Sequence, residues 1–251
     1  MTESPAHHTD HESPTSGHLL GGRVRYIQPR LGFRSGIEPV LLAASVPVRP
    51  GERVLEGGAG AGAALLCLAA RLPGLQGVGI ERDAALVALA EQNAAANHWP
   101  GLRFQTGDMA SPPDLGMFDH AFANPPYHSA QGTPSPDLSR QAAKRGTEDL
   151  LAIWAATLGR RVRPGGTLTF ILPAGLLPRA TVAFAAAHCQ PVAMLPLWPK
   201  FGIAAKLVLL RGIKGSKAPF RVLPGLVLHN LANEFTPQAE AILRDGLGLS
   251  L

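Results

Sequence analysis

The fold of this chain is decided by the stretch Arg53-Val54-Leu55-Glu56-Gly57-Gly58-Ala59-Gly60-Ala61-Gly62. Its first four residues predict a buried strand, and an apolar helix is expected to follow through Leu72. Glycines are needed between the two elements because the backbone must turn sharply and approach a ligand closely. A strand, a glycine-rich turn and a helix in this order predict an α/β fold.

Predicted strands and helices alternate over the rest of the chain. After the first strand, further strands are expected at Gly77–Ile80, Leu102–Thr106, Phe118–Ala123, Thr167–Leu172, near Val192–Leu197 and at Lys206–Leu210. Helical segments lie between most of them, at Ala84–Asn97, Leu150–Val162 and Leu176–His188. The expected architecture is therefore a doubly wound, seven-stranded, mostly parallel sheet that ends in an antiparallel hairpin.

The length of 251 residues fits one such domain with additions. Residues 1–18 are polar, contain prolines and four histidines, and are expected to form a disordered tail. Residues 19–50 predict a lead-in strand and helix, and residues 51–251 the main domain. No metal site is expected at His7, His8 and His11, because no cysteine or further ligand is nearby.

Composition limits the class of partner and the compartment. The net charge of +5 and the pI near 9.7 favour an anionic partner such as nucleic acid. No apolar run is long enough to span a membrane, and no secretory signal is visible. Cys67 and Cys189 lie far apart in apolar surroundings and are expected to be buried thiols, which suits the cytoplasm.

The stretch Asn124-Pro125-Pro126-Tyr127 follows the predicted strand Phe118–Ala123. Two prolines cannot continue a strand, so the chain leaves the sheet here in a stiff extended turn. The Asn124 amide oxygen and the Pro125 carbonyl can accept two hydrogen bonds, and Tyr127 adds an aromatic face. An exocyclic –NH2 on a flat ring, such as that of adenine, fits this pocket.

The glycine-rich stretch fits two kinds of cofactor, because Gly58, Gly60 and Ala63 also satisfy the dinucleotide fingerprint. Glu56 decides between them. A dinucleotide places pyrophosphate over the loop and helix N-terminus, where this acid would repel it by roughly 4 kcal/mol at about 4 Å. S-adenosylmethionine carries an ammonium and a sulfonium, which the acid would attract.

Both motifs resemble those of class I S-adenosylmethionine-dependent methyltransferases, a Rossmann-like family. The stretch from Val54 to Gly62 resembles their first motif, with Gly57 where a bulky apolar residue is usual, and Asn124 to Tyr127 resembles the motif of enzymes that methylate amino nitrogens. The resemblance implies a cofactor site with Glu81 on the ribose and Asp108 near the adenine; the residues expected to line it are Glu56, Gly58, Gly60, Gly62, Glu81, Asp108 and Asn124. Asn124, Pro125 and Tyr127 are expected to act on the acceptor.

A narrower resemblance covers residues 22–245. Gln28-Pro29, the lead-in around Arg34–Ala44 and the tail Leu228–Arg244 look like the bacterial tRNA adenine N6-methyltransferases that act on a valine tRNA. This chain has Ile37-Glu38 where that family commonly has Thr-Asp. The resemblance implies methylation of an adenine in tRNA, in the anticodon loop, after base flipping.

Alternatives share part of the evidence. The chain could instead be a release-factor-type protein glutamine N5-methyltransferase or a ribosomal RNA guanine N2-methyltransferase. The substrates of both enzymes also offer an –NH2 group to the same two acceptors. An NAD-dependent oxidoreductase would have no use for Asn124 to Tyr127, and a catalytically silent RNA-binding module would not need Glu56 and Glu81.

Residues 128–141 are expected to form a lid. The basic residues beyond the pocket, Arg140, Lys144 and Arg145, are expected to bind substrate. The oligomeric state is left open.

Overall fold

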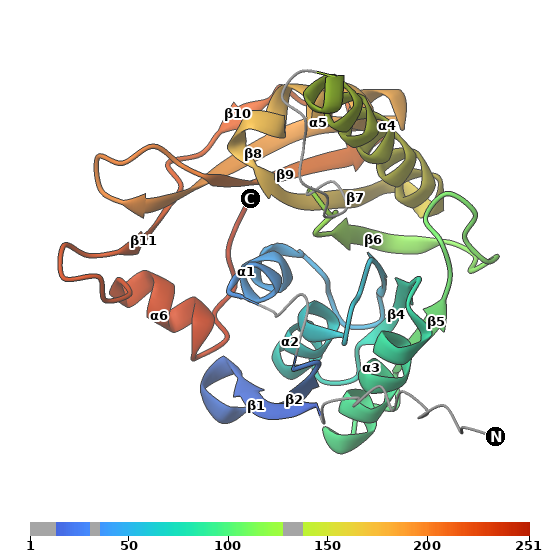
Figure 1. Ribbon diagram of the computed structural model, residues 1–251, viewed down its shortest axis with the longest axis vertical. Coiled ribbons are helices and arrows are strands. Elements are labelled where there is room, and N and C mark those ends of the chain that lie inside the picture. The colour runs from blue at the N-terminus through green and yellow to red at the C-terminus, as the bar shows by residue number, and fades with distance from the viewer. Residues whose placement is uncertain (1–13, 31–35, 128–137) are drawn as a thin grey trace, which may run out of the picture.

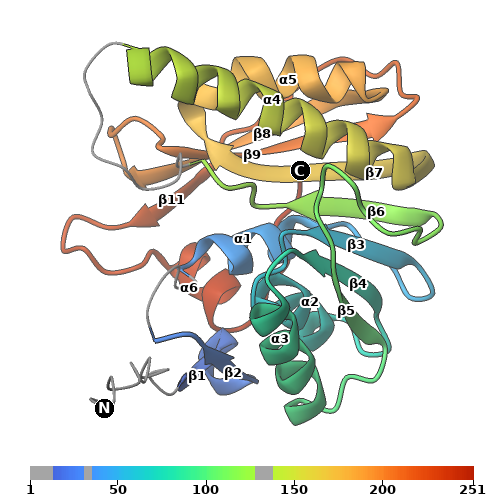
Figure 2. The same ribbon diagram turned by 45° about the vertical axis from the view of Figure 1, so that its right-hand side comes forward.

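The computed structural model in Figure 1 describes residues 14–30, 36–127 and 138–251, with the backbone alone for residues 138–149. A mostly parallel sheet forms the middle layer, and helices cover both of its faces (Figures 1 and 2). No helix in these ranges is long and apolar enough to cross a membrane.

The central sheet has the order β10-β8-β9-β7-β6-β3-β4-β5, and β11 also pairs with β8. The bounds of its strands are β3 (Arg53–Gly57), β4 (Gln76–Glu81), β5 (Leu102–Thr106), β6 (Phe118–Ala123), β7 (Val162–Pro173), β8 (Cys189–Lys200), β9 (Leu207–Lys214), β10 (Arg221–Val222) and β11 (Leu226–His229). Only β9 runs antiparallel to its neighbours, β7 and β8. The seven predicted strands and the antiparallel hairpin are confirmed; two short strands at the edge of β8 bring the described sheet to nine.

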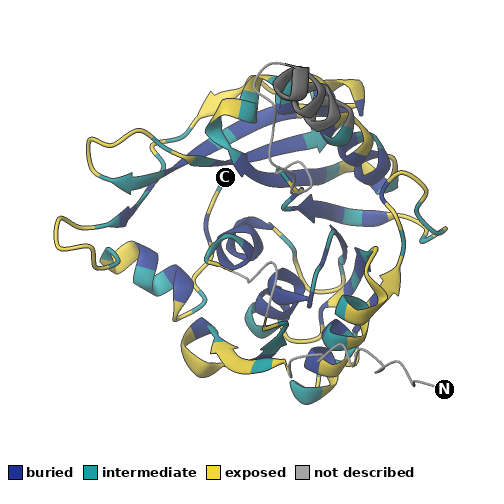
Figure 3. Ribbon diagram, viewed as in Figure 1, coloured by how far each residue is buried: buried dark blue, intermediate teal, exposed yellow. Residues whose placement is uncertain are grey.

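The two faces of the sheet carry separate cores, which are the dark blue layers of Figure 3. On one face lie α1 (Glu38–Ser45), α2 (Ala63–Arg71), α3 (Ala84–Ala96) and α6 (Pro237–Leu243). On the other face lie α4 (Leu138–Arg161) and α5 (Leu177–Ala186). Fully buried aromatic side chains, among them Phe122 and Phe170, fill the space between sheet and helices. This burial, at about 25 cal/mol per Å² of apolar surface, is the main stabilising contribution.

The N-terminal segment corrects the predicted tail. Residues 15–18 belong to β1 (Thr15–Leu19), which pairs antiparallel with β2 (Val24–Gln28) in a separate two-stranded sheet. The turn between them is a 3-10 turn in which Gly21 and Gly22 have φ of +60° and +101°, values that favour glycine. Thr15–Leu19 is too polar to signal a strand on its own, and pairing with β2 determines its structure.

Two asparagines fasten β2 to α3. The Asn97 side chain accepts from the Arg25 N–H at 2.8 Å and donates to the Arg25 carbonyl at 2.7 Å. Asn93, which is fully buried, does the same with Ile27 at 2.8 Å in each direction. Each side-chain amide therefore bonds both the N–H and the carbonyl of one β2 residue, as the backbone of a neighbouring strand would. The lead-in is in this way fixed against the main domain.

Candidate active site

A cleft of about 1610 Å³ opens at the carboxyl ends of β3, β4 and β6. β3 lies between β4 and β6, so the chain order reverses here, and such a switch point is where open α/β sheets bind ligands. Glu56 pairs in register with Phe122, and Gly57 with Ala123, so the residues that follow these two strands emerge side by side. The cleft is lined by Glu56, Gly58, Gly60, Glu81, Asp108, Asn124, Pro125 and Tyr127, among others.

The glycine-rich turn is shaped by two different requirements. Gly58 and Gly60 have φ of +67° and +55°, in the left-handed region that side chains disfavour. A Cβ on Gly58 would also lie 2.5 Å from the indole of Trp154, whereas one on Gly60 would meet open space. The backbone at Gly60 is therefore free to contact a ligand. At Gly58 the turn packs against Trp154 of α4.

Gly62 and Gly57 lie under the turn and are absent from the lining of the cleft. Gly62 precedes α2 with φ of +90°, and a Cβ there would meet the Phe104 ring at 2.9 Å. The space beside Gly57 is filled by Leu158 and Met109, whose side-chain atoms would lie 3.1 and 3.2 Å from a Cβ. Leu158 and Met109 thus occupy the volume that a larger side chain at position 57 would fill. In the structure Gly62 shapes the turn, and its expected contact with a cofactor stays a prediction.

Glu56 is a buried carboxylate at the end of β3. Its Oε2 accepts a hydrogen bond from the Leu65 N–H, at 3.2 Å, in the first turn of α2. The glycine before this helix has no side chain to cap it, so Glu56 satisfies one of its free N–H groups. Burial, with a smaller contribution from the nearby Glu81 charge, nevertheless raises the pKa of Glu56 well above its usual range.

Glu81 reaches across from the end of β4 to the glycine-rich turn. One carboxylate oxygen accepts from the Gly60 N–H at 3.0 Å, and the other accepts from the Asp83 N–H at 3.1 Å. Asp108, after β5, is exposed and accepts from the Ala110 N–H at 2.8 Å. Each of these carboxylates keeps lone pairs for a ligand. Over the described side chains, neither Glu56 nor Glu81 forms an ion pair.

Asn124 and Pro125 present two acceptors to the cleft. Asn124 is half-buried, and Pro125 is buried. Within the described ranges, the Asn124 side chain and the Pro125 carbonyl make no hydrogen bond. Because the chain cannot use these oxygens in its own ladder, they are available to an N–H donor from a ligand.

Tyr127 is anchored at its hydroxyl. Its O–H donates to the carbonyl of Ile171 in β7, and its half-buried ring packs against the core while lining the cleft. Burial raises the pKa of Tyr127 well above its usual value, so the phenol stays protonated. Its ring is therefore held in a fixed place beside Asn124.

Sequence reasoning missed one wall of the cleft. Leu150, Ile153 and Trp154 line it from α4, and Ile153 is 40% exposed despite its apolar side chain. Their spacing of three and four residues places them on one helical face, but the same spacing is typical of ordinary core. The opposite wall comes from the lead-in, with Tyr26, Pro29, Arg30, Glu38 and Pro39.

Some predicted features fall outside what the structure describes. The expected lid lies mostly in residues 128–137, and Arg140, Lys144 and Arg145 lie on α4 where only the backbone is described. His7, His8 and His11 precede the first described residue. Among the side chains that are described, no three His, Cys, Asp or Glu residues gather closely enough to hold a metal ion.

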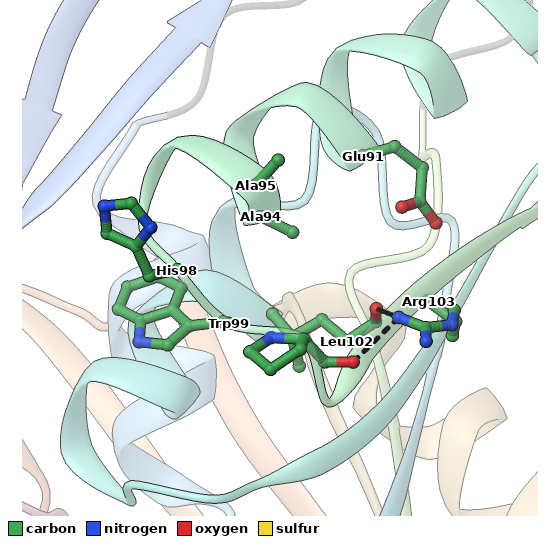
Figure 4. Close-up of a pocket in the computed structure, with 8 residues that line it drawn as sticks. Glu91, Ala94, Ala95, His98, Trp99, Leu102 and Arg103 are labelled. Atoms are coloured by element: carbon green, nitrogen blue, oxygen red, sulfur yellow. Dashed lines mark hydrogen bonds between the residues drawn. The ribbon is translucent and has the colours of Figure 1, made fainter.

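A second hollow, of about 470 Å³, lies where α3 ends and β5 begins, at the opposite edge of the sheet (Figure 4). Its polar groups are used within the fold. Arg103 donates to the carbonyls of Pro100 and Leu102, as the dashed lines in Figure 4 show, and Glu91 accepts from the Phe104 N–H at 2.6 Å. The hollow therefore offers a ligand little chemistry, and the larger cleft is the candidate site.

Comparison with known proteins agrees with this geometry. Residues 38–150 match the family described as the methyltransferase small domain. The chain is 29% identical over 223 residues to the tRNA1(Val) (adenine(37)-N6)-methyltransferase of Actinobacillus succinogenes, covering 86% of this chain and 91% of that one. It is 27% identical over 186 residues to the protein of the same description from Aeromonas hydrophila, covering 72% and 77%.

Solved structures show the same fold. A predicted O-methyltransferase from Agrobacterium tumefaciens superposes with a TM-score of 0.71 at 22% identity, over 85% of this chain and 99% of that chain. A methyltransferase from Pyrococcus furiosus superposes with a TM-score of 0.51 at 20% identity, over 67% and 77%. At these identities the likeness concerns the fold.

Proposed function

We propose that this chain, a class I S-adenosylmethionine-dependent methyltransferase by family match and by fold, transfers the methyl group to the N6 amino group of an adenine in tRNA. One observation carries the proposal. Among the residues that the structure describes, the same cleft holds the carboxylates of Glu56 and Glu81 without a cationic partner and, beside them, the Asn124 and Pro125 oxygens without a hydrogen-bond donor. A cationic cofactor and a neutral amino group complement these two sets.

The residues of the cleft fit the cofactor. A buried carboxylate without a counter-charge is costly, as the raised pKa of Glu56 shows, and a bound sulfonium or ammonium would supply that charge. Glu81 would accept from the ribose hydroxyls, and Asp108 from the adenine amino group. The open backbone at Gly60 would let the cofactor lie against the turn. A pyrophosphate would instead face both carboxylates, which disfavours a dinucleotide.

The acceptor would be held by Asn124, Pro125 and Tyr127. When bound, S-adenosylmethionine supplies an activated methyl group on its sulfonium. The Asn124 amide oxygen and the Pro125 carbonyl accept from the two N–H groups of the adenine, so its nitrogen lone pair is turned out of conjugation with the ring. Tyr127 stacks on the flipped base, an interaction worth about 1–3 kcal/mol. The chain's contribution to catalysis is orientation.

The choice of tRNA adenine rests on relatives and on charge. The two relatives described above are named for N6 methylation of adenine 37 in tRNA1(Val). The net charge of +5 favours a polyanion over a protein substrate. We infer a cytoplasmic location from the proposed tRNA substrate, and the buried thiols of Cys67 and Cys189 support it because free thiols are typical of a reducing compartment.

We infer the domain organisation from the residues that line the cleft. Residues 51–251 would form the catalytic domain, and the lead-in of residues 19–50 would complete its wall through Tyr26, Pro29 and Glu38. The family match begins at residue 38, within this lead-in. The part of α4 that carries Arg140, Lys144 and Arg145 would then contact substrate beyond the pocket, next to the proposed lid.

The test offers the enzyme unmodified total tRNA and a release factor side by side, with a labelled methyl donor. We expect label in tRNA and, after digestion, in N6-methyladenosine by mass spectrometry of nucleosides. Label in the protein alone would replace adenine with glutamine as the acceptor. With ribosomal RNA offered in a parallel reaction, label in its guanosine would equally contradict the proposal.

A further inference from the structure

Two loops leave the sheet side by side at its carboxyl edge, at the left of Figure 1. One is the turn between β8 and β9, residues 201–206, and the other follows β11, residues 230–236. β11 runs parallel to β8 with His229 opposite Lys200, so both loops begin at the same level. The Lys200 ammonium donates to the carbonyl of Leu231 at 3.3 Å and joins the two loops.

These loops expose large apolar side chains. Phe201 is 86% exposed, Leu231 is 88% exposed and Ile203 is 52% exposed. Single exposed apolar residues are ordinary, but three on adjoining loops form a patch, and such patches mark interaction sites. We refer to Lys200, Phe201, Ile203, Lys206 and Leu231 as the loop surface.

The backbone under this patch is well held. The Ile203 N–H donates to the Lys200 carbonyl at 3.1 Å, which closes the first loop. In the second loop, the Asn230 side chain both accepts from the Glu234 N–H and donates to the Glu234 carboxylate, each at 3.0 Å. The apolar side chains are therefore presented by ordered turns, and a partner that binds them has little backbone entropy to remove.

The charges indicate which partner. Residues 200–206 contain Lys200 and Lys206 and no acid. Glu234, the acid of the second loop, is bonded to Asn230. An exposed aromatic ring between two lysines is the combination that binds single-stranded nucleic acid, because bases stack on the ring and phosphates meet the ammonium groups.

The loop surface is continuous with the active-site cleft. Leu207, directly after Lys206, lines the cleft together with Pro173, its partner across the β7–β9 ladder. The Ala174 N–H donates to the Lys206 carbonyl at 2.9 Å. Tyr127 is bonded to Ile171 on the same β7 strand. A strand of RNA with one base at Tyr127 would therefore pass the carboxyl end of β7, at Pro173, on its way toward Phe201.

We propose that the loop surface binds an unpaired nucleotide of the substrate RNA that flanks the target base, with Phe201 stacking on its base and Lys200 and Lys206 contacting its phosphates. The proposal rests on the proposed function for the class of substrate, RNA. It adds a second contact, outside the reaction pocket, that places the target loop.

The experiment measures the dissociation constant of a fluorescein-labelled RNA stem-loop with a seven-nucleotide loop, by anisotropy. Phe201→Ala should weaken binding about 5- to 150-fold, the range for one lost base–aromatic stack. Phe201→Trp should bind within about twofold of wild type, whereas Phe201→Leu should lose nearly as much as alanine, since stacking needs a ring. The matched control is Phe220→Ala, which removes another exposed phenylalanine before β10, at the opposite edge of the sheet.

The lysines have their own test. Lys206→Ala should weaken binding and make the slope of log affinity against log salt shallower by about 0.7, the value for one phosphate contact in a single strand. Lys217→Ala, in the exposed β9–β10 connection, is the matched control and should change neither. All variants should bind S-adenosylmethionine as the wild type does, because the loop surface does not contact the cofactor site.

The outcomes separate this proposal from the proposed function, which is judged by methylation of tRNA with the wild type alone. Equal affinities for Phe201→Ala and Phe220→Ala, or full rescue by Phe201→Leu, would overturn the loop surface as an RNA site. Failure of the wild type to bind the stem-loop would overturn it too. So would sedimentation showing a dimer that Phe201→Ala dissociates, because the patch would then be an interface between copies of this chain.

Discussion

The carboxylate of Glu81 accepts a hydrogen bond from the backbone N–H of Gly60 at 3.0 Å, so the end of β4 holds the turn that follows β3. The second oxygen is bonded to the Asp83 N–H in the same way. One side chain thus both fixes the glycine-rich turn and aims its remaining lone pairs into the cleft.

Glu81→Ala should therefore weaken binding of S-adenosylmethionine by about 10- to 150-fold, the equivalent of about 1.5–3 kcal/mol for hydrogen bonds to a charged group. Isothermal titration calorimetry measures it. Glu91→Ala is the control, since Glu91 also bonds a backbone N–H but lies outside the cleft. It should cost stability and leave the affinity unchanged. Equal losses of affinity in both variants would mean that Glu81 acts only through the fold.

Glu56 should make both stability and cofactor affinity depend on pH. An ordinary glutamate ionises near pH ~4.3, and burial raises the pKa of Glu56 well above that value in the folded protein. Between the two values the folded protein holds more protons than the unfolded chain, so the free energy of unfolding falls as pH rises through this window. A cationic cofactor favours the ionised carboxylate, so its affinity should rise over the same window.

Glu56→Gln should remove both dependences. Urea unfolding of the free protein should give a flatter pH profile and higher stability near pH ~7, because no buried charge has to form. Calorimetry should give weaker binding of S-adenosylmethionine that no longer changes with pH. A glutamine variant that binds the methyl donor as well as wild type at neutral pH would contradict the role of this charge.

Gly58 and Gly60 should respond differently to alanine. Both have positive φ, and an alanine there costs roughly 1–2 kcal/mol of backbone strain. Only Gly58 also faces Trp154, at 2.5 Å from the added Cβ. Urea unfolding should therefore show a larger loss for Gly58→Ala than for Gly60→Ala, and Trp154→Ala in the same chain should remove part of the difference. Equal losses in the two variants would contradict the packing of α4 on the turn.

The strands that deliver the site were predictable because parallel strands buried on both faces read as short continuous apolar runs. β6 is such a strand, and two prolines set its end, whereas β5 is a half-exposed edge strand whose predicted bounds, Leu102–Thr106, are also confirmed. Polar residues directly after such strands meet at one edge of the sheet. Glu56, Glu81 and Asn124 lie at the carboxyl ends of three such strands and therefore line one cleft.

The features that were missed depend on partners distant in sequence. Thr15–Leu19 is a strand only because β2 offers it an edge. Trp154 lines the cleft because α4 crosses the turn at Gly58, and its spacing along the helix looks like any buried face. Glycine spacing likewise cannot show that Gly60 faces open space while Gly62 faces Phe104.

Two substitutions at Tyr127 should distinguish the contribution of its ring from that of its hydroxyl. Tyr127→Phe loses the hydrogen bond to the Ile171 carbonyl and should cost about 0.5–1.5 kcal/mol of stability in thermal or urea unfolding. It should keep most methyl transfer, because stacking needs only the ring. Tyr127→Ala should lose activity at saturating cofactor. If phenylalanine lost as much activity as alanine, the hydroxyl and not the ring would be the functional group.

Asn124→Ala should lower kcat by about 100-fold or more, because misplacing a reacting group costs that much when catalysis is mostly orientation. The variant should fold as the wild type does, since the Asn124 amide makes no hydrogen bond within the described chain that its loss would break. Its affinity for S-adenosylmethionine should change by less than about threefold, because the acidic residues Glu56 and Glu81 remain.

Single-turnover methylation of tRNA measures the turnover of Asn124→Ala, and calorimetry on the same preparation measures its affinity for the cofactor. Gln190→Ala is the control, because it removes an exposed amide side chain on β8 that lies outside the cleft. Wild-type turnover in Asn124→Ala would show that the amino group is held by other residues.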